Sequence, residues 1–170
     1  MAQFRSATHF SQQLSAPYAG VIWHSGITYM KQIEFKMWQL KDRPSIKEQI
    51  DLWLQLQGDC SSAWSSCDFE ATGIKLLFRN ETNDIDGKCL VIASIFLSDD
   101  MQRKGFLKSL LKYLVGKSPY EFIAFEDIDN PILLSFCKRN SFEPVSKMYP
   151  NSMLVHKSKL QSLSAVEFSY

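Results

Sequence analysis

The stretch "DDMQRKGFLKSLLKYL" (residues 99–114) decides the fold, because it leads a polar, basic turn directly into a leucine-rich helix. An apolar strand, "CLVIASIFL" (Cys89–Leu97), comes just before it. A helix N-terminus exposes unpaired backbone N–H groups and a partial positive charge, which suit a bound anion. Gly105 permits a close backbone approach, and Arg103 and Lys104 add charge. The sequence predicts a strand–turn–helix unit that either cradles a phosphate or is an ordinary turn with solvated lysines.

The composition is that of an ordinary globular domain. The chain has 170 residues, of which 45% are hydrophobic and 22% charged, enough to bury the core of a single domain. Its formal net charge of +1 gives no global field that would favour nucleic acid or an anionic membrane. No apolar run is long enough to span a bilayer, and no signal peptide is recognisable. We therefore expect a cytoplasmic protein with free thiols.

The residue types that bind metals are scattered along the chain. None of the four cysteines forms a CxxC pair, and the three histidines lie far apart in sequence. Metal sites need closely spaced ligands of these types. We expect no metal.

The first part of the chain predicts mixed local structure. Residues 1–20 are irregular, and Gly26–Leu40 is β-prone because apolar residues alternate in places. Arg43–Gly58 is an amphipathic helix that ends at its glycine. The Ser-rich segment Asp59–Asp68 is expected to be a loop.

The second half predicts strands that alternate with helices. A hairpin joins Gly73–Glu81 to Lys88–Leu97 across "TNDIDG", which has the residues of a turn. The second of these strands is apolar on both faces, so it is expected near the middle of the sheet. The elements that follow are a helix at Gly105–Gly116, a strand at Tyr120–Ile128, a helix at Asp129–Asn140 with Asn130 as N-cap and Pro131 in its first turn, and a strand at Ser152–Ser158.

Two segments of this half resemble the GNAT superfamily of N-acetyltransferases. That family places a [Q/R]xxGx[G/A] turn between a strand and a helix. "QRKGFL" stands in that place here, with Gln102 and Gly105 matching. Downstream the family has a strand, an Asn near a helix start, and an aromatic helix end that leads to "GF". "FIAFEDIDNPILLSFCKRNSFEPV" (residues 122–145) has the same order, with Asn130 in place and "NSF" where "GF" would be.

The resemblance implies an α/β (α+β) fold with a central mixed, mostly antiparallel sheet and helices on both faces. It covers residues 73–158, which would be the acyl-CoA-binding core of one domain spanning residues 1–170. Residues 1–70 match nothing in the family. They would form a divergent N-terminal part that shapes the acceptor site.

The resemblance also implies acetyl-CoA as the acyl donor, with its pyrophosphate on the turn and its pantetheine arm on the backbone of the preceding strand. Leu107 departs from the family, which has Gly or Ala there. Its side chain would either crowd the cofactor or point into the core. The implied cofactor-binding residues are Phe96, Leu97, Ser98, Gln102, Arg103, Lys104, Gly105, Phe106, Leu107 and Asn130.

The catalytic residues are harder to assign. The family alignment puts Cys137 where many members have the Tyr that protonates the CoA thiolate, although a cysteine on a helix face is more often a small buried hydrophobe. Tyr149 and Tyr120 are alternative acids. Glu126 is the first choice of base, because ligands collect at the carboxyl ends of strands in α/β sheets. Glu70 is a weaker choice of base. Acidic loop residues such as these are often simply solvated and have no catalytic role. In some family members a chain of water molecules takes the place of a base.

The N-terminal part offers candidate acceptor contacts. Asp59, Asp68 and Glu70 would suit a cationic amine such as a lysine side chain, a polyamine or an aminoglycoside. Trp64, in a Ser-rich loop, is either pinned to the core or exposed for a partner, and pinning is favoured.

Three functions stay open at this point. The first is an acyl-CoA-dependent N-acyltransferase that acetylates an amine of a protein (a lysine or N-terminus) or of a small molecule. The second is a catalytically degenerate GNAT-fold binding or regulatory protein. The third is a GNAT-fold nucleic-acid-modifying enzyme, with Lys104, Lys108 and Lys112 along a backbone; the neutral net charge argues against a nucleic-acid partner. Neither a membrane partner nor a fixed oligomer is predicted, and a homodimer is compatible with the sequence.

Overall fold

The computed structural model describes residues 32–59, 64–81 and 89–170. Residues 1–31, 60–63 and 82–88 lie outside the described residues, so the predictions for residues 1–20, for Cys60 and for the connection between the two hairpin strands fall there. None of the helices within the described ranges is long and apolar enough to cross a membrane.

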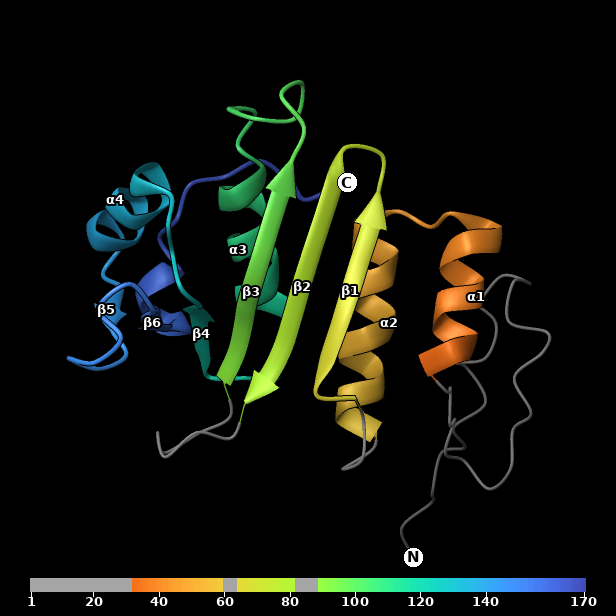
Figure 1. Ribbon diagram of the computed structural model, residues 1–170, viewed down its shortest axis with the longest axis horizontal. Helices are drawn as coiled ribbons and strands as arrows, with labels where there is room; N and C mark the ends of the chain where they lie inside the picture. The colour runs from red at the N-terminus through yellow and green to blue at the C-terminus, as the bar shows by residue number, and fades with distance from the viewer. Residues whose placement is uncertain (1–31, 60–63, 82–88) are drawn as a thin grey trace, which may run out of the picture.

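The described strands form one six-stranded sheet with the order β1-β2-β3-β4-β6-β5 (Figure 1). The β3–β4 pair is parallel and the other pairs are antiparallel. The expected α/β class with a mixed, mostly antiparallel sheet is thereby confirmed. The strands are β1 (Ser66–Ala71), β2 (Ile74–Glu81), β3 (Cys89–Leu97), β4 (Phe122–Phe125), β5 (Glu143–Pro144) and β6 (Met153–His156).

Within the described ranges, four α-helices and one short 3₁₀ helix accompany the sheet. The helices α2 and α3 lie behind it in the view of Figure 1. Ser45 and Glu48 cap α2 reciprocally: Glu48 N donates to Ser45 Oγ at 3.2 Å, and Ser45 N donates to Glu48 Oε2 at 2.8 Å. The helices are α1 (Gln32–Asp42), α2 (Ile46–Asp59), α3 (Phe106–Lys117), α4 (Pro131–Arg139) and η1 (Lys157–Leu160).

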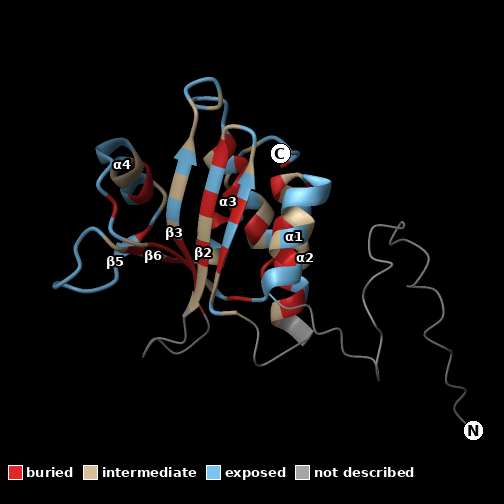
Figure 2. Ribbon diagram, turned by 45° about the vertical axis from the view of Figure 1, so that its right-hand side comes forward, coloured by how far each residue is buried: buried red, intermediate tan, exposed pale blue. Residues whose placement is uncertain are grey.

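One hydrophobic core joins the helices to one face of the sheet. It contains buried residues from all four α-helices, among them Phe35, Trp53 and Leu110. Trp53 meets the rings of Phe69 and Phe78 edge-on, with centroids 5.8 and 6.1 Å away. Figure 2 marks buried residues both along the strands and on the helices.

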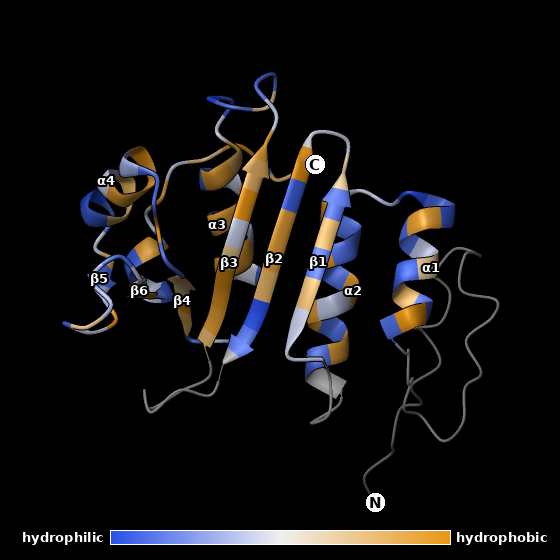
Figure 3. Cartoon of the chain, viewed as in Figure 1, coloured by the Kyte–Doolittle hydropathy of each residue, from blue (hydrophilic) through white to orange (hydrophobic). Residues whose placement is uncertain are grey.

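The opposite face of the sheet has a much smaller apolar cluster. Its buried members are Cys89, Val91 and Ala124, with Phe122 and Leu154 packed against them. No described helix contributes to this cluster. The strand β3 is hydrophobic over most of its length (Figure 3). Its side chains therefore contribute alternately to the large core and to the small cluster on the opposite, open face.

Two local predictions were wrong. Gln32–Asp42, which overlaps the stretch expected to be β-prone, is the helix α1, because its Gln, Glu, Lys and Met residues are good helix formers and Phe35 anchors the helix in the core. The expected loop at Asp59–Asp68 gives way to β1 from Ser66 onward. β1 forms because it pairs with β2 over six residues, a contact that the sequence of the segment alone does not reveal.

The segment after η1 ties the start of α2 to the start of α3. The ring of Phe168 is buried and lies 5.7 Å from that of Phe106 and 5.2 Å from that of Tyr113. The Lys47 amide donates to the Tyr170 carbonyl at 2.8 Å. This packing holds the first turn of α3 in place.

Candidate functional site

β3 extends beyond the strand that pairs with it on one side. β4 pairs only with Cys89–Ile92, whereas β2 accompanies β3 as far as Leu97. The stretch Ala93–Leu97 therefore has no strand partner on its β4 side among the described residues (Figure 1). Such an edge presents backbone N–H and C=O groups to a ligand.

A β-bulge in the pairing of β2 with β3 lies at the point where β4 separates from β3. Phe78 pairs with Ile92 and Leu77 with Ser94, so Ala93 is an extra residue on β3. Bulges bend a strand and re-aim its backbone groups, often beside functional sites. Sequence reasoning missed this feature, for which the small pair Ala93–Ser94 in an otherwise apolar strand is the only local signal.

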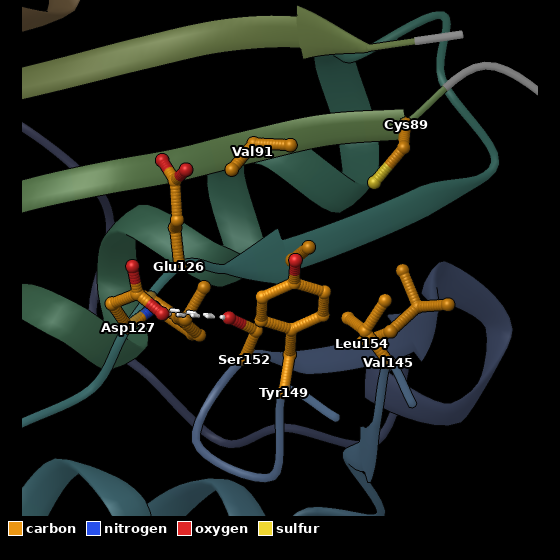
Figure 4. Close-up of a pocket in the computed structure, with 10 residues that line it drawn as sticks. Cys89, Val91, Glu126, Asp127, Val145, Tyr149, Ser152 and Leu154 are labelled. Atoms are coloured by element: carbon orange, nitrogen blue, oxygen red, sulfur yellow. Dashed lines mark hydrogen bonds between the residues drawn. The ribbon is translucent and has the colours of Figure 1, made fainter. Parts of the chain in front are cut away.

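A pocket of about 320 Å³ opens on the face that carries the small apolar cluster, beside the same parting of strands (Figure 4). Its walls come from β3, from the end of β4 and the residues after it, and from the segment 145–154. Its lining residues are Cys89, Val91, Ala124, Phe125, Glu126, Asp127, Val145, Tyr149, Ser152 and Leu154.

Two acidic residues line this pocket. Arg79 Nη1 donates to both carboxylate oxygens of Glu126, at 2.7 and 3.0 Å. The Asp127 amide donates to Ser152 Oγ at 3.1 Å, and that hydroxyl donates to the Asp127 carboxylate at 3.3 Å. The predicted base Glu126 thus lies in the pocket, held by a cation that the sequence analysis did not single out.

Tyr149 lies across the same pocket. Its ring is drawn within the cavity in Figure 4, with the hydroxyl pointing toward β3 and β4. The residue is 58% exposed, so its phenol is open to solvent and to a ligand. The segment 146–152 turns back on itself at this residue, because the Tyr149 amide donates to Ser146 and its carbonyl accepts from Ser152.

The structure separates the three candidate acids. Cys137 has no exposed surface, and burial raises the pKa of its thiol to about 12. Proton transfer from such a thiol to a thiolate of ordinary pKa would be uphill. Tyr120 is also buried, and burial raises its pKa. Of the three, Tyr149 alone lines the pocket.

The turn between β3 and α3 has the backbone that the sequence suggested. Gly105 is left-handed, with φ +83°, and a Cβ there would meet nothing within 4 Å. The Gln102 side chain is held within the turn, because its Nε2 donates to the Leu97 carbonyl and to Asp99 Oδ1, at 3.0 and 3.1 Å. Leu107 packs against the core, so its side chain does not fill the turn.

The charge of this turn is balanced. Arg103 and Lys104 are exposed, but Asp99 and Asp100 lie in the same turn. A hydrogen bond from Ser98 lowers the pKa of Asp100, so its negative charge persists to lower pH. Anion binding here would depend chiefly on the amides of the α3 N-terminus.

The remaining predicted residues are distributed around the fold. Phe96 is 56% exposed on the unpartnered part of β3. Asn130 caps α4, as predicted, by accepting from the amides of Ile132 and Leu133, so its side-chain oxygen is already engaged.

Of the three acids proposed for the acceptor, Asp68 and Glu70 lie away from the pocket, and the side chain of Asp59 is outside what the structure describes. Asp68 and Glu70 lie on β1, at the far edge of the sheet, and pair with Lys36 and Lys75 at 3.7 and 2.8 Å. Trp64 contacts the ring of Phe35 with centroids 5.2 Å apart, which confirms that it is pinned to the core.

No protein-family model matches this chain, and none of the curated proteins does. Solved structures with partial similarity include "Crystal structure of AtaTR bound with AcCoA", at 10% identity over 52% of this chain and 60% of that chain, with a TM-score of 0.42. Two others, of the AtaT–AtaR complex bound to DNA and of a KacTA–DNA complex, share 11% identity and a TM-score of 0.41. They are covered over 62% and 60% of their length, and 52% and 53% of this chain is matched. This chain thus spans less than two thirds of each, and its function has to be argued from its own residues.

Proposed function

We propose that this protein transfers an acyl group from an acyl-CoA, acetyl-CoA by default, to an amine. The observation that carries the proposal is the unpartnered edge Ala93–Leu97 of β3. It begins at the pocket with Glu126 and Tyr149 and ends at the turn with Gly105. The donor would then lie along three features in succession: a phosphate-binding turn, a strand edge that offers hydrogen bonds, and a pocket with an acid and a base.

The dimensions support this arrangement. Five residues of strand span about 16 Å, which separates the turn from the parting of β3 and β4 by the length of an extended amide-containing arm. Pantetheine is such an arm, with two amides that can pair with strand backbone as a further strand would. The open space at Gly105 leaves room for the pyrophosphate beside the first amides of α3.

The residues near the bulge would perform the chemistry. Backbone N–H groups re-aimed at Ala93 would polarise the thioester carbonyl and stabilise the oxyanion as the amine attacks. A C–N bond forms, the C–S bond breaks, and the amine loses a proton. We assign Glu126, directly or through water, to accept that proton. Tyr149 would protonate the departing thiolate in place of Cys137, which is buried.

The pocket also indicates the class of acceptor. Glu126 and Asp127 line it together with the apolar side chains of Val91, Val145 and Leu154. A primary amine on an aliphatic stem would match this combination.

Isothermal titration with acetyl-CoA tests the donor, and release of free CoA thiol across a panel of amines tests the reaction. We expect micromolar binding and acceptor-dependent turnover. If the folded protein shows no affinity for acetyl-CoA or CoA, the proposal is wrong.

A CoA-binding protein without turnover is the second candidate. The observation that favours it is the Arg79–Glu126 pair, which occupies both oxygens of the proposed base. This candidate predicts CoA binding with no thiol release for any amine, so the same two measurements distinguish it from the enzyme.

A further inference from the structure

A second pocket lies on the helix side of the molecule, between the start of α3, the end of α4 and the segment that follows η1. It has a volume of about 330 Å³, within the range of small-molecule sites. Its apolar lining residues are Phe136, Leu160 and Leu163, of which the first two are buried, and we call these three residues its apolar floor. The polar lining residues are Lys108, Arg139, Asn140, Lys159, Ser162 and Ser164.

Three cations from three separate elements line this cavity. Lys108 comes from α3, Arg139 from α4 and Lys159 from η1. Among the described residues, neither Lys108 nor Arg139 forms an ion pair, while Lys159 binds Glu143 at 2.8 Å. Two positive charges are therefore left without a countercharge. Like charges gathered around a concave surface raise the local potential and attract an anion.

The C-terminus of α4 opposes an anion less than an uncapped helix end would. A helix C-terminus carries a partial negative charge on its last carbonyls. The Phe136 and Cys137 carbonyls are already covered, because Asn140 donates to Phe136 O from Nδ2 at 2.8 Å and the Phe142 amide donates to Cys137 O at 3.1 Å. Arg139 is oriented by its Nε, which donates to the Ser135 carbonyl at 3.3 Å, and its terminal nitrogens remain for a ligand.

We propose that this cavity binds a phosphate monoester. A phosphate monoester carries close to two negative charges at neutral pH, which matches the two uncompensated cations, and it accepts hydrogen bonds from hydroxyls such as those of Ser162 and Ser164. The apolar floor suits the organic part of the ester. The phosphate has two sources that the same chemistry fits: the phosphorylated ribose of CoA, or a separate phosphorylated metabolite.

The first source rests on the proposed function and follows from position. Lys108 is three residues beyond Gly105, one helical turn along α3, so the cavity begins next to the turn that would hold the pyrophosphate. The second source does not depend on the proposed function, since it needs only the cavity.

The test compares two double variants of equal charge. Lys108→Gln with Arg139→Gln removes the two unpaired cations. Lys112→Gln with Lys138→Gln removes two exposed cations from the same helices that do not line the cavity. Titrations use CoA, dephospho-CoA, which lacks the ribose phosphate, and inorganic phosphate at constant ionic strength.

If the donor supplies the phosphate, the wild type binds CoA at least about tenfold more tightly than dephospho-CoA, and the first double variant removes that difference. If a separate metabolite does, CoA and dephospho-CoA bind alike and inorganic phosphate binds to the CoA-saturated wild type. In both cases the Lys112 and Lys138 variant behaves as the wild type. Should the protein bind no form of CoA, the proposed function fails, while phosphate binding that depends on Lys108 and Arg139 still supports the cavity. The proposal is overturned if the two double variants bind every ligand alike.

Discussion

Arg79 and Glu126 are 47 residues apart in sequence, yet Arg79 Nη1 touches both oxygens of the Glu126 carboxylate, at 2.7 and 3.0 Å. Arg79 lies on β2, where it pairs with Val91 of β3, and Glu126 comes directly after β4. The pair therefore spans β3 on the open face of the sheet and fixes the acidic wall of the pocket.

We expect Glu126→Gln to lower kcat/KM for the amine by at least about tenfold, because the pocket loses its proton acceptor. The cost in folding free energy should stay near or below about 1 kcal/mol, since both side chains are a third or more exposed. Steady-state kinetics and thermal unfolding separate the two effects. Glu70→Gln is the matched control: it breaks the exposed ion pair with Lys75, and it should leave the kinetics unchanged.

Tyr149→Phe removes one hydroxyl from an exposed ring, so the fold should be unaffected. If the phenol protonates the thiolate, kcat falls by about a hundredfold while the dissociation constant for acetyl-CoA is unchanged. Rapid-mixing assays of thiol release give the first quantity, and calorimetry the second. Met148→Ala alters the exposed neighbour and should retain full activity. Wild-type kcat in Tyr149→Phe would exclude the role assigned to this residue.

Gly105→Asp and Gly105→Asn compare two side chains of the same shape in a left-handed position that both tolerate better than other residues. The Asp variant places a carboxylate beside the expected pyrophosphate. We expect it to bind acetyl-CoA at least about tenfold more weakly than the Asn variant, by like-charge repulsion. The difference in acetyl-CoA affinity between the two variants should become smaller at high salt. Equal affinities in the two variants would mean that the turn does not hold the pyrophosphate.

Cys67 and Cys137 predict an alkaline loss of stability. Burial raises the pKa of each thiol from 9.0 to about 12. Because the pKa is higher in the folded state, the thiols ionise first in the unfolded chain. The free energy of unfolding therefore keeps its full value below about pH 9 and falls as the pH rises from 9 to 12, by up to about 1.4 kcal/mol per pH unit for each thiol. Urea unfolding at pH 8 and pH 10 measures the fall. Cys67→Ala should remove about half of the pH-dependent decrease in unfolding free energy that the two thiols cause. If the decrease between pH 8 and pH 10 is the same in this variant as in the wild type, the thiols are not its cause.

The elements that were predicted correctly are those whose patterns are local and strong. β2 and β3 alternate or run apolar on either side of a turn sequence, and α4 begins at an Asn–Pro cap that the structure reproduces. The secondary structures of α1 and β1 were not predicted because they depend on contacts with distant segments. Phe35 of α1 packs against Phe69, and β1 pairs with β2. Segments with weak periodicity take the structure that their neighbours stabilise.

The candidate site was predicted in part for the same reason. The turn at Gly105 and the position of Glu126 follow from strand ends, which a sequence reveals. Arg79, the bulge at Ala93 and the placement of Tyr149 in the pocket depend on register and on the path of the segment 145–152. Alignment with the family pointed to Cys137, whereas its burial is a property of packing that spacing does not encode.

The short contact between β3 and β4 bears on how the molecule folds and opens. β1, β2 and β3 are successive neighbours, so their pairings close short loops and form early. β3 and β4 share four residue pairs, and the chain between them includes all of α3. We expect the contact between β3 and β4 to form late and to separate first. The amide of Glu126, which donates to the Ile92 carbonyl of β3, and that of Ala124, on the same edge of β4, should then exchange their hydrogens sooner than those of Leu76 and Phe78. The part of the sheet that is slowest to assemble would then be the part that admits and releases the reactants.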